Sequence, residues 1–377
     1  MQVSLVAAGR VVVVHFILLC VIFAGPQVIA ADWPLVRGDA ASTGRAEGTL
    51  PADPQILWEH SVGGAGFEGT PIIAGGAVYC ADVDGRVLCL DLSKGNVRWE
   101  QKLDTGFIAG GAVRDGRFFI GDYDGVVTHS VLRTAKSNGL SRRKHRSIRG
   151  ANFYGENLLI TSEDGVLYCL TQSAGELKWK YETGDQLRCS PSLAGNKTFL
   201  GGCDGKLHIV DVEKGERVQE PLPLESPTGS TPTVLGETVF VPTHSGDIFA
   251  FDAATGMQLW HFKDPKLAQE FQNSVAVAEG LVIASSHNRR VFALDLKTGE
   301  KRWDVPVRKR ADSSPITVGN RVIVTATDGR LIILELSSGR DLGVREVKGG
   351  FIASAAYSDG RIVAVSDKGT IYCFGAK

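Results

Sequence analysis

Residues 70–99 read TPIIAGGAVYCADVDGRVLCLDLSKGNVRW, and this stretch decides the fold. It opens with a small residue and continues with an apolar stretch, a Gly turn, a β-branched run, an Asp-Gly turn and a Leu-Asp strand. A Lys-Gly turn and a closing segment with Trp99 end the unit. Alternating apolar residues between turns of this kind are typical of antiparallel hairpins. The stretch therefore predicts four short antiparallel strands.

The same order of features recurs with a period close to forty residues. Other clear copies are residues 190–219, 231–260, 274–303 and 314–343. The opening residues, at successive intervals of 40, 40, 40, 41, 43, 40 and 40, are Thr70, Gly110, Gly150, Ser190, Thr231, Ser274, Ser314 and Ser354. Four strands per unit at this period indicate propeller blades, whereas helical repeats would space apolar residues three and four apart. We therefore expect an all-β, eight-bladed β-propeller of four-stranded antiparallel blades.

The two ends of the chain together supply the last blade. The eighth unit ends at GTIYCFGAK (residues 369–377), which provides a third strand and no fourth. The missing closing strand appears in PQILWEHSVGG (residues 54–64), with Trp58 at the closing position. Pairing at this seam would leave no long edge strand open. We predict that this N-terminal strand completes the last blade of a propeller spanning residues 56–377.

A tryptophan closes most of the repeats, and we assign it a structural role. These closing-strand tryptophans are Trp58, Trp99, Trp179, Trp260 and Trp303. The corresponding positions at Gln219 and Gly343 have lost theirs. The aspartates of the second turns recur too regularly to be catalytic, because Asp-Gly suits a tight hairpin. No Ser-His-Asp or Cys-His grouping emerges, so no catalytic residue is predicted.

Residues 1–30 have the layout of a secretory signal peptide. Arg10 precedes the apolar run VVVVHFILLCVIFAG, and the following QVIA favours cleavage before Ala31. An uncleaved N-terminal anchor is the alternative, while lipid attachment at Cys20 is disfavoured because a bulky residue precedes it. No later apolar run approaches the ~20 residues that a membrane span needs. We therefore expect a soluble periplasmic or secreted protein, in which residues 31–55 form a lead-in to the propeller.

Charge and cysteine usage exclude several kinds of function. With 41 basic and 42 acidic side chains, no global field steers the chain toward polyanions. None of the cysteines forms a C-x-x-C pair, so zinc and thioredoxin-type sites have no support. A two-residue Asp84-Gly85 turn would place Cys80 opposite Cys89 for a disulfide, whereas a bulged turn would break that register. Buried free thiols are the interpretation that we favour.

Residues 126–150, VVTHSVLRTAKSNGLSRRKHRSIRG, depart from the repeat and are strongly basic. Ser130, Ala135 and Gly139 stand where the pattern requires Leu, Gly and Trp, although the forty-residue spacing is kept. Codons read one frame over can restore these residue types, so we hypothesise a local frame change in the gene over residues 129–148. A basic docking loop or a solvated charge run are the alternatives. Nucleic-acid binding is disfavoured because the basic residues lack interleaved aromatics.

The repeats DGRVLCLDLSKGNVRW, DGVLYCLTQSAGELKW and NRRVFALDLKTGEKRW resemble the PQQ-type propeller repeat. That family includes quinoprotein alcohol dehydrogenases and the BamB-type propeller of the bacterial outer-membrane β-barrel assembly machinery. The segment DWPLVRGDAASTG is also similar to the W-P-x-x-R-G lead-in of many exported bacterial members. The resemblance is specific for the fold and says little about function, because one scaffold hosts many activities.

The resemblance implies two alternative functions. Quinoprotein dehydrogenases are longer and use calcium ligands, a catalytic Asp and an adjacent Cys-Cys pair, which this chain lacks. Pyrroloquinoline quinone (PQQ) with Ca²⁺ is therefore expected only under the alternative of a quinoprotein oxidoreductase. The BamB-type propeller matches in length and blade number, and it presents rim loops to protein partners without catalysis. We expect a monomeric, exported, non-catalytic scaffold that binds protein partners at a propeller rim, with no cofactor and no metal.

Any ligand site of a propeller is expected on the central axis, where the inner strands begin. The residues two positions before the opening residues form one polar arc and one apolar arc. The candidate funnel residues of the polar arc and its neighbours are Glu68, Arg188, Gln272, Asn273, Arg310 and Asp312. They favour a small polar or peptide ligand. The alternative is that charges at a wet channel mouth satisfy one another.

Overall fold

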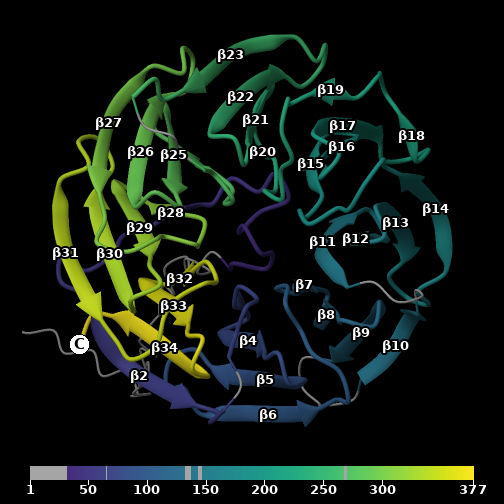
Figure 1. Ribbon diagram of the computed structural model, residues 1–377. Helices are drawn as coiled ribbons and strands as arrows, with labels where there is room; N and C mark the ends of the chain where they lie inside the picture. Colours follow the sequence, from purple (N-terminus) through teal and green to yellow (C-terminus); the bar gives the residue numbers. More distant parts are fainter. Residues whose placement is uncertain (1–31, 65, 132–136, 143–146, 267–269) are drawn as a thin grey trace, which may run out of the picture. The chain divides into compact units, whose positions relative to one another are not determined.

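The computed structural model describes residues 32–64, 66–131, 137–142, 147–266 and 270–377. The chain divides into two units, Met1–Ala30 and Ala31–Lys377, and only the second contains described residues. The expected signal peptide lies outside the described residues, as does much of the basic segment within 129–148. The described part is all-β, with eight sheets around a common axis (Figure 1). The prediction of an eight-bladed propeller is confirmed.

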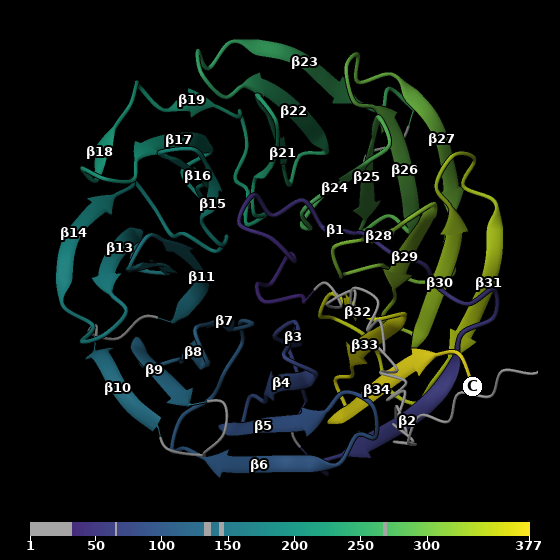
Figure 2. The same cartoon turned by 180° about the vertical axis from the view of Figure 1, so that it is seen from behind.

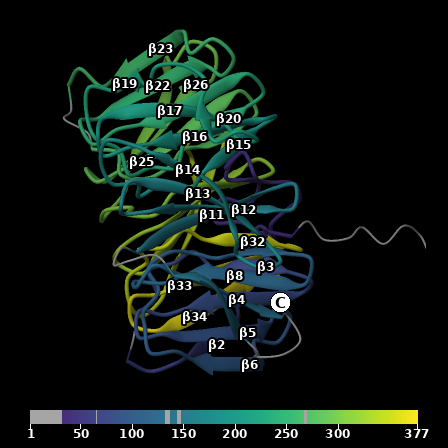
Figure 3. The same cartoon turned by 90° about the vertical axis from the view of Figure 1, so that its right-hand side faces the viewer.

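Blades one to four contain consecutive strands in chain order. Blade one holds β3 (Ile72–Ala74), β4 (Ala77–Ala81), β5 (Arg86–Asp91) and β6 (Val97–Lys102), and blade two holds β7 (Ala112–Arg114), β8 (Arg117–Gly121), β9 (Val126–Val131) and β10 (Ser137–Arg142). Blade three holds β11 (Ile148–Tyr154), β12 (Asn157–Ser162), β13 (Val166–Thr171) and β14 (Leu177–Glu182), of which β13 and β14 are seen from the side in Figure 3. Blade four holds β15 (Ser192–Ala194), β16 (Lys197–Gly201) and β17 (Lys206–Asp211), and its outer position is divided between β18 (Glu216–Arg217) and β19 (Leu222–Pro223).

Blades five to eight repeat this order, with two additions from the N-terminal part. Blade five holds β20 (Thr233–Leu235), β21 (Thr238–Pro242), β22 (Asp247–Asp252) and β23 (Gln258–Lys263), and blade six holds β24 (Ala276–Ala278), β25 (Leu281–Ser286), β26 (Arg290–Asp295) and β27 (Lys301–Pro306). Blade seven holds β28 (Ile316–Val318), β29 (Arg321–Thr325), β30 (Arg330–Glu335) and β31 (Asp341–Glu346), and β1 (Arg45–Ala46) pairs in parallel with β28. Blade eight holds β32 (Ala356–Ser358), β33 (Arg361–Val365), β34 (Thr370–Gly375) and β2 (Gln55–Ser61).

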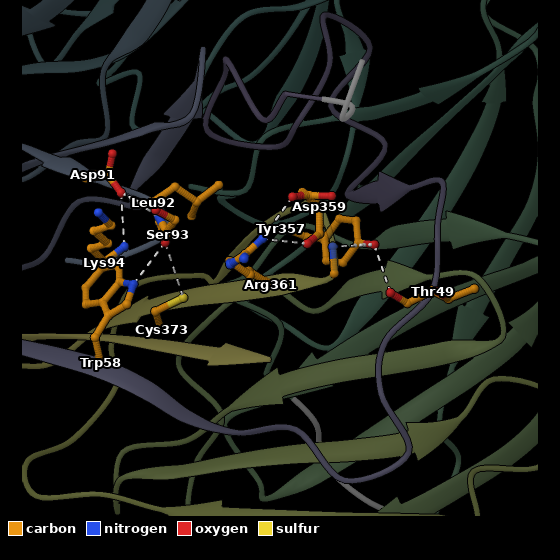
Figure 4. A network of polar contacts seen from close by, with 11 residues as sticks. Thr49, Trp58, Asp91, Leu92, Ser93, Lys94, Tyr357, Asp359, Arg361 and Cys373 are labelled. Carbon is orange, nitrogen blue, oxygen red and sulfur yellow. Dashed lines mark hydrogen bonds and ion pairs between the residues drawn. The ribbon is translucent and has the colours of Figure 1, made fainter. Parts of the chain in front are cut away.

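The seam of the ring lies in blade eight, as expected from the sequence. Strand β2 pairs antiparallel with β34, and Glu59 lies opposite Tyr372. The indole Nε1 of Trp58 donates to the carbonyl of Leu92 in blade one at 2.9 Å, and Cys373 lies against the same carbonyl (Figure 4). The N-terminal strand therefore closes blade eight and joins it to blade one.

The closing-strand tryptophans act between blades. Trp260 of β23 donates from Nε1 to the carbonyl of Leu296 in blade six at 3.0 Å. Its ring covers Gly299, where a Cβ would come within 2.6 Å of the indole and where φ is +71°, so glycine is required twice over. The equivalent pairs are Trp58 on Gly95, Trp179 on Gly215 and Trp303 on Gly339. The repeated Trp and Gly thus form one contact that fastens four pairs of neighbouring blades.

The lead-in runs around the axis and touches the inner strands (purple in Figures 1 and 2). The backbone N–H of Ile73 donates to the carbonyl of Trp33 at 3.0 Å, and the equivalent residue of five other blades donates in the same way. These bonds run from Val113 to Pro34, Leu193 to Ala40, Val234 to Ala41, Val277 to Thr43 and Thr317 to Gly44. Asn152 of blade three and Tyr357 of blade eight bond through their side chains, to the carbonyls of Ala40 and Thr49. The lead-in is therefore bonded to all eight blades.

Hydrogen bonds alone do not hold the lead-in in place. Each contributes a net of about 0.5–1.5 kcal/mol, whereas ordering a residue costs about 1–2 kcal/mol of backbone entropy. The large side chains of Trp33, Leu35 and Leu50 are 2%, 8% and 7% exposed. Burying such a side chain contributes about a further 1.5–3 kcal/mol. Buried apolar side chains thus help to hold the lead-in in place, and its backbone carbonyls accept from the inner strands around the ring.

The cysteines of the described residues are free, which the sequence favoured. Cys80 lies opposite Leu88 and Cys89 lies opposite Tyr79, so the turn places the two thiols out of register. Burial raises the pKa of Cys89 to about 11. The buried thiols therefore stay protonated at neutral pH and serve as small apolar side chains.

Candidate functional site

A cavity of about 190 Å³ lies on the axis, where the chain crosses from the outer strand of one blade to the inner strand of the next. Five of the expected funnel residues line it: Glu68, Arg188, Gln272, Asn273 and Asp312. The sixth, Arg310, donates from Nη2 to Asp312 at 2.8 Å. The crossovers of different blades thus bring together residues far apart in the sequence.

The charged groups at the mouth of this cavity largely balance one another. Glu163 accepts from Arg149 and lies 3.6 Å from the Nε of Arg188. Asp312 is paired with Arg310 and lies 3.3 Å from the Nε2 of His287. Partly exposed pairs of this kind contribute about 0–1 kcal/mol each. They leave the mouth polar but without a strong excess of one charge.

The two amides of the funnel have local partners. The Nδ2 of Asn273 donates to the carbonyl of Ala311 at 2.8 Å and so ties blade six to blade seven. Gln272 donates to the carboxylate of Glu270 on its own crossover. Asn273 is therefore positioned by the fold, whereas Gln272 sits in an exposed local contact.

A ring of hydroxyls forms much of the cavity wall. The backbone N–H of Thr231 donates to the Oγ of Ser274 at 2.9 Å, and the same bond recurs from blade to blade. The other links are Ser190 to Thr231, Ser274 to Ser314 and Ser314 to Ser354. Each of these hydroxyls accepts from the preceding blade and keeps its own proton for donation. The small polar residue that opens these repeats is thus a link between blades.

Arg37 of the lead-in lies in the wall of the same cavity and is only 2% exposed. Its Nη2 donates to the carbonyls of Val275 and Pro315, at 3.1 and 2.8 Å. Its Nε and Nη1 are buried and have no hydrogen-bond partner among the described residues. Burial lowers the pKa of Arg37 to about 10, and Asp39 opposes this shift. Gly44, at φ +64°, leaves the space that this guanidinium occupies.

The described residues do not fit the quinone and calcium of the oxidoreductase alternative. No group of three or more His, Cys, Asp or Glu side chains suited to a metal occurs in the described part of the chain. The cavity is also smaller than the roughly 300–1,000 Å³ of typical small-molecule sites. Its wall offers mainly hydroxyls and guanidinium groups, whereas calcium requires several oxygen ligands, carboxylates above all.

A family model described as outer membrane protein assembly factor BamB matches residues 43–140, 130–263 and 246–342. The chain belongs to this BamB family. BamB of Burkholderia pseudomallei is 26% identical over 353 residues, which cover 85% of this chain and 88% of the relative. BamB of Escherichia coli is 24% identical over 381 residues, with the same two shares covered.

Solved structures agree with the fold of the BamB family. The crystal structure of BamB from Moraxella catarrhalis aligns with a TM-score of 0.73 at 19% identity and covers 86% of this chain and 100% of that one. Quinohemoprotein alcohol dehydrogenase from Comamonas testosteroni aligns with a TM-score of 0.78 at 14% identity and covers 92% and 80%. At these identities the likeness concerns the fold alone. The described residues contain no helix of the length and apolarity that a membrane crossing needs.

Three polar residues of the cavity could not be predicted from the sequence. Arg37 and Ser230 line the cavity, and Arg149 stands at its mouth. Arg37 belongs to the W-P-x-x-R-G lead-in, but a motif far outside the repeat gives no position on the axis. Ser230 directly precedes an opening residue, so the repeat alignment offered a signal for it. Arg149 lies in the basic segment that departs from the repeat, where the residues that guide the alignment are missing.

Proposed function

We propose that this protein is an exported, non-catalytic scaffold that works in outer-membrane protein assembly and binds a protein partner at its rim. The observation that carries the proposal is the extent of the BamB match, which spans 85% of this chain and 88% of the Burkholderia relative. The correspondence covers most of both proteins. A periplasmic location is part of this proposal.

Exposed apolar side chains favour one part of the rim as the contact. Met257 and Leu259, at the start of the outer strand of blade five, are 62% and 43% exposed. Val218 of blade four is 40% exposed, and its neighbour Gln219 lies against Gly256 beside Met257. These three exposed apolar side chains lie on the outer parts of two adjacent blades. Exposed apolar groups at a rim favour protein binding.

Outer-membrane assembly in the bacterium that encodes the chain tests the proposal. Deletion of the gene should lower the amount of folded outer-membrane β-barrel proteins, measured by their heat-modifiable gel mobility. The wild-type gene should restore it, and the double variant Met257→Glu/Leu259→Glu should restore it only in part. Val97→Glu is the matched control, because Val97 is 40% exposed at the outer strand of blade one. Unchanged barrel assembly after deletion would refute the proposal.

Spectral titration distinguishes the scaffold from the quinoprotein alternative. The purified protein is titrated with PQQ and calcium and is then assayed for dye-linked alcohol oxidation. The scaffold predicts neither saturable binding nor turnover. Saturable binding accompanied by oxidation would instead support an oxidoreductase.

A further inference from the structure

The guanidinium of Arg37 is a buried cation without a full set of partners. Only its Nη2 is bonded, to two backbone carbonyls, while Nε and Nη1 have no partner among the described residues. Asp39, the acidic group that favours its charge, already accepts from the N–H of Thr43 at 3.1 Å and from the hydroxyl of Thr43. Asp39 supplies a nearby negative charge, but a buried N–H group without an acceptor is unfavourable. Nε and Nη1 therefore need acceptors from elsewhere.

The cavity beside Arg37 has room for such a group and is lined with donors. Its volume of about 190 Å³ far exceeds the roughly 10–15 Å³ that one water molecule needs. The hydroxyl of Ser230 is buried in this wall and also lacks a partner among the described residues. The hydroxyls of Ser274 and Ser314 accept from the preceding blades and retain their protons for donation. Arg188 adds a second cation near the mouth.

The carboxylates of the cavity do not supply the missing acceptors. Asp312 is engaged by Arg310 and lies close to His287. Glu68 is an exposed residue of the crossover from blade eight to blade one. Neither is among the groups that raise the pKa of Arg37. The cavity wall around Arg37 is thus cationic and lined with hydroxyls.

We propose that the axial cavity binds one small oxyanion, held by the Nε and Nη1 of Arg37 and by the hydroxyls of Ser230 and the surrounding ring. Guanidinium and hydroxyl donors converging from several sides suit the oxygens of phosphate, sulfate or a small carboxylate. The bound anion accepts from the deeply buried guanidinium of the lead-in and links that segment to the blades. This inference is independent of the proposed role in outer-membrane assembly, since it concerns the axis and not the rim.

Calorimetric titration of the purified protein with inorganic phosphate, sulfate and acetate tests this site, with chloride at equal ionic strength as the reference. We expect saturable binding of one oxyanion, at least ten-fold tighter than chloride, and a melting temperature that rises with oxyanion concentration. The three titrations show which oxyanion the pocket prefers. Equal binding of oxyanions and chloride would overturn the proposal.

Two variants locate the site, and one serves as control. Arg37→Gln should weaken binding at least ten-fold, but it also removes bonds to Val275 and Pro315 and lowers stability. Ser230→Ala leaves those bonds in place and should weaken binding several-fold in a fully folded protein. Arg340→Gln, in an exposed pair with Glu335 on the third turn of blade seven, should bind like the wild type. Unchanged oxyanion affinity in Ser230→Ala and in folded Arg37→Gln would refute the site.

Discussion

The junction between blades five and six and the junction between blades two and three use the same two positions with different residues. At the first, Trp260 covers the neighbouring turn and the hydroxyl of Ser274 accepts from the preceding blade. At the second, Gly139 stands at the tryptophan position and Gly150 at the hydroxyl position. Strand β10 nevertheless pairs with β9, with one register shift, and β11 pairs with β12. Strand pattern and period therefore determine the blades, while the repeated side chains fasten one blade to the next.

Removing the tryptophan at the complete junction should have the largest effect. Trp260→Ala deletes a side chain that is 7% exposed together with its bond to Leu296, and it should cost about 3–5 kcal/mol. The free energy of unfolding in urea measures this loss. Gln219→Ala, at the same position of blade four, is the control and should cost far less. Equal losses in the two variants would show that the tryptophan is not what holds the junction.

Adding a hydroxyl at the incomplete junction should destabilise the protein. The Cβ of Gly150→Ser would overlap Ser190, so the neighbouring crossover must shift, at a cost of about 1–3 kcal/mol. The double variant Gly150→Ser/Ser190→Gly should recover part of this loss in a double-mutant cycle. A gain in melting temperature from Gly150→Ser alone would contradict the interpretation, because it would mean that the glycine only lacks a link.

Removing one link of the hydroxyl ring should have a smaller effect. Ser274→Ala leaves the N–H of Thr231 without its acceptor. Since Ser274 lines the cavity, water replaces part of the bond, and we expect a loss of about 1 kcal/mol. The shift of the urea midpoint measures it, and the exposed Ser337→Ala should produce no shift. A loss as large as that of Trp260→Ala would show that the hydroxyl link at the axis stabilises the fold as much as the tryptophan contact.

The smallest effect concerns pH at the turn that Trp260 covers. The bond from Arg302 and the N–H of Thr298 lower the pKa of Asp295 to about 2, below its ordinary value of 3.8. A carboxylate with a lowered pKa stabilises the fold above its unfolded value, and this contribution is lost as the pH falls toward 2. The difference in melting temperature between the wild type and Asp295→Asn should therefore shrink between pH 5 and pH 2. A difference that stays constant over this range would exclude the ion pair as its source.

The repeat was sufficient to predict the ring, its eight blades and the closure by Trp58. Each of these follows from local alternation and from a count of strands, which the sequence displays directly. It also placed Glu68, Arg188 and Asp312 on the axis, because equivalent positions of a ring face the same channel. The binding role of these residues remains a prediction.

The path of the lead-in and the position of Arg37 could not be predicted in this way. The segment has no period of its own, and its bonds use backbone carbonyls, which leave no trace in residue type. The missing disulfide depended on a shift of a single residue at the turn after Cys80, and sequence spacing does not resolve such a shift. The contacts of elements outside the repeat could therefore be identified only in the structure.

Closure by the N-terminal residues has a consequence for how the molecule is made. A nascent chain emerges with its N-terminus first, yet β2 finds its partner only when Thr370–Gly375 has been synthesised. The carbonyls of the segment from Trp33 to Thr49 likewise await donors from inner strands as late as Tyr357. The lead-in and β2 are thus synthesised before their partners and can pair only after the C-terminal blades are available. Until Thr370–Gly375 is available, the ring stays open with an unpaired strand edge, which exposes the chain to aggregation and proteolysis.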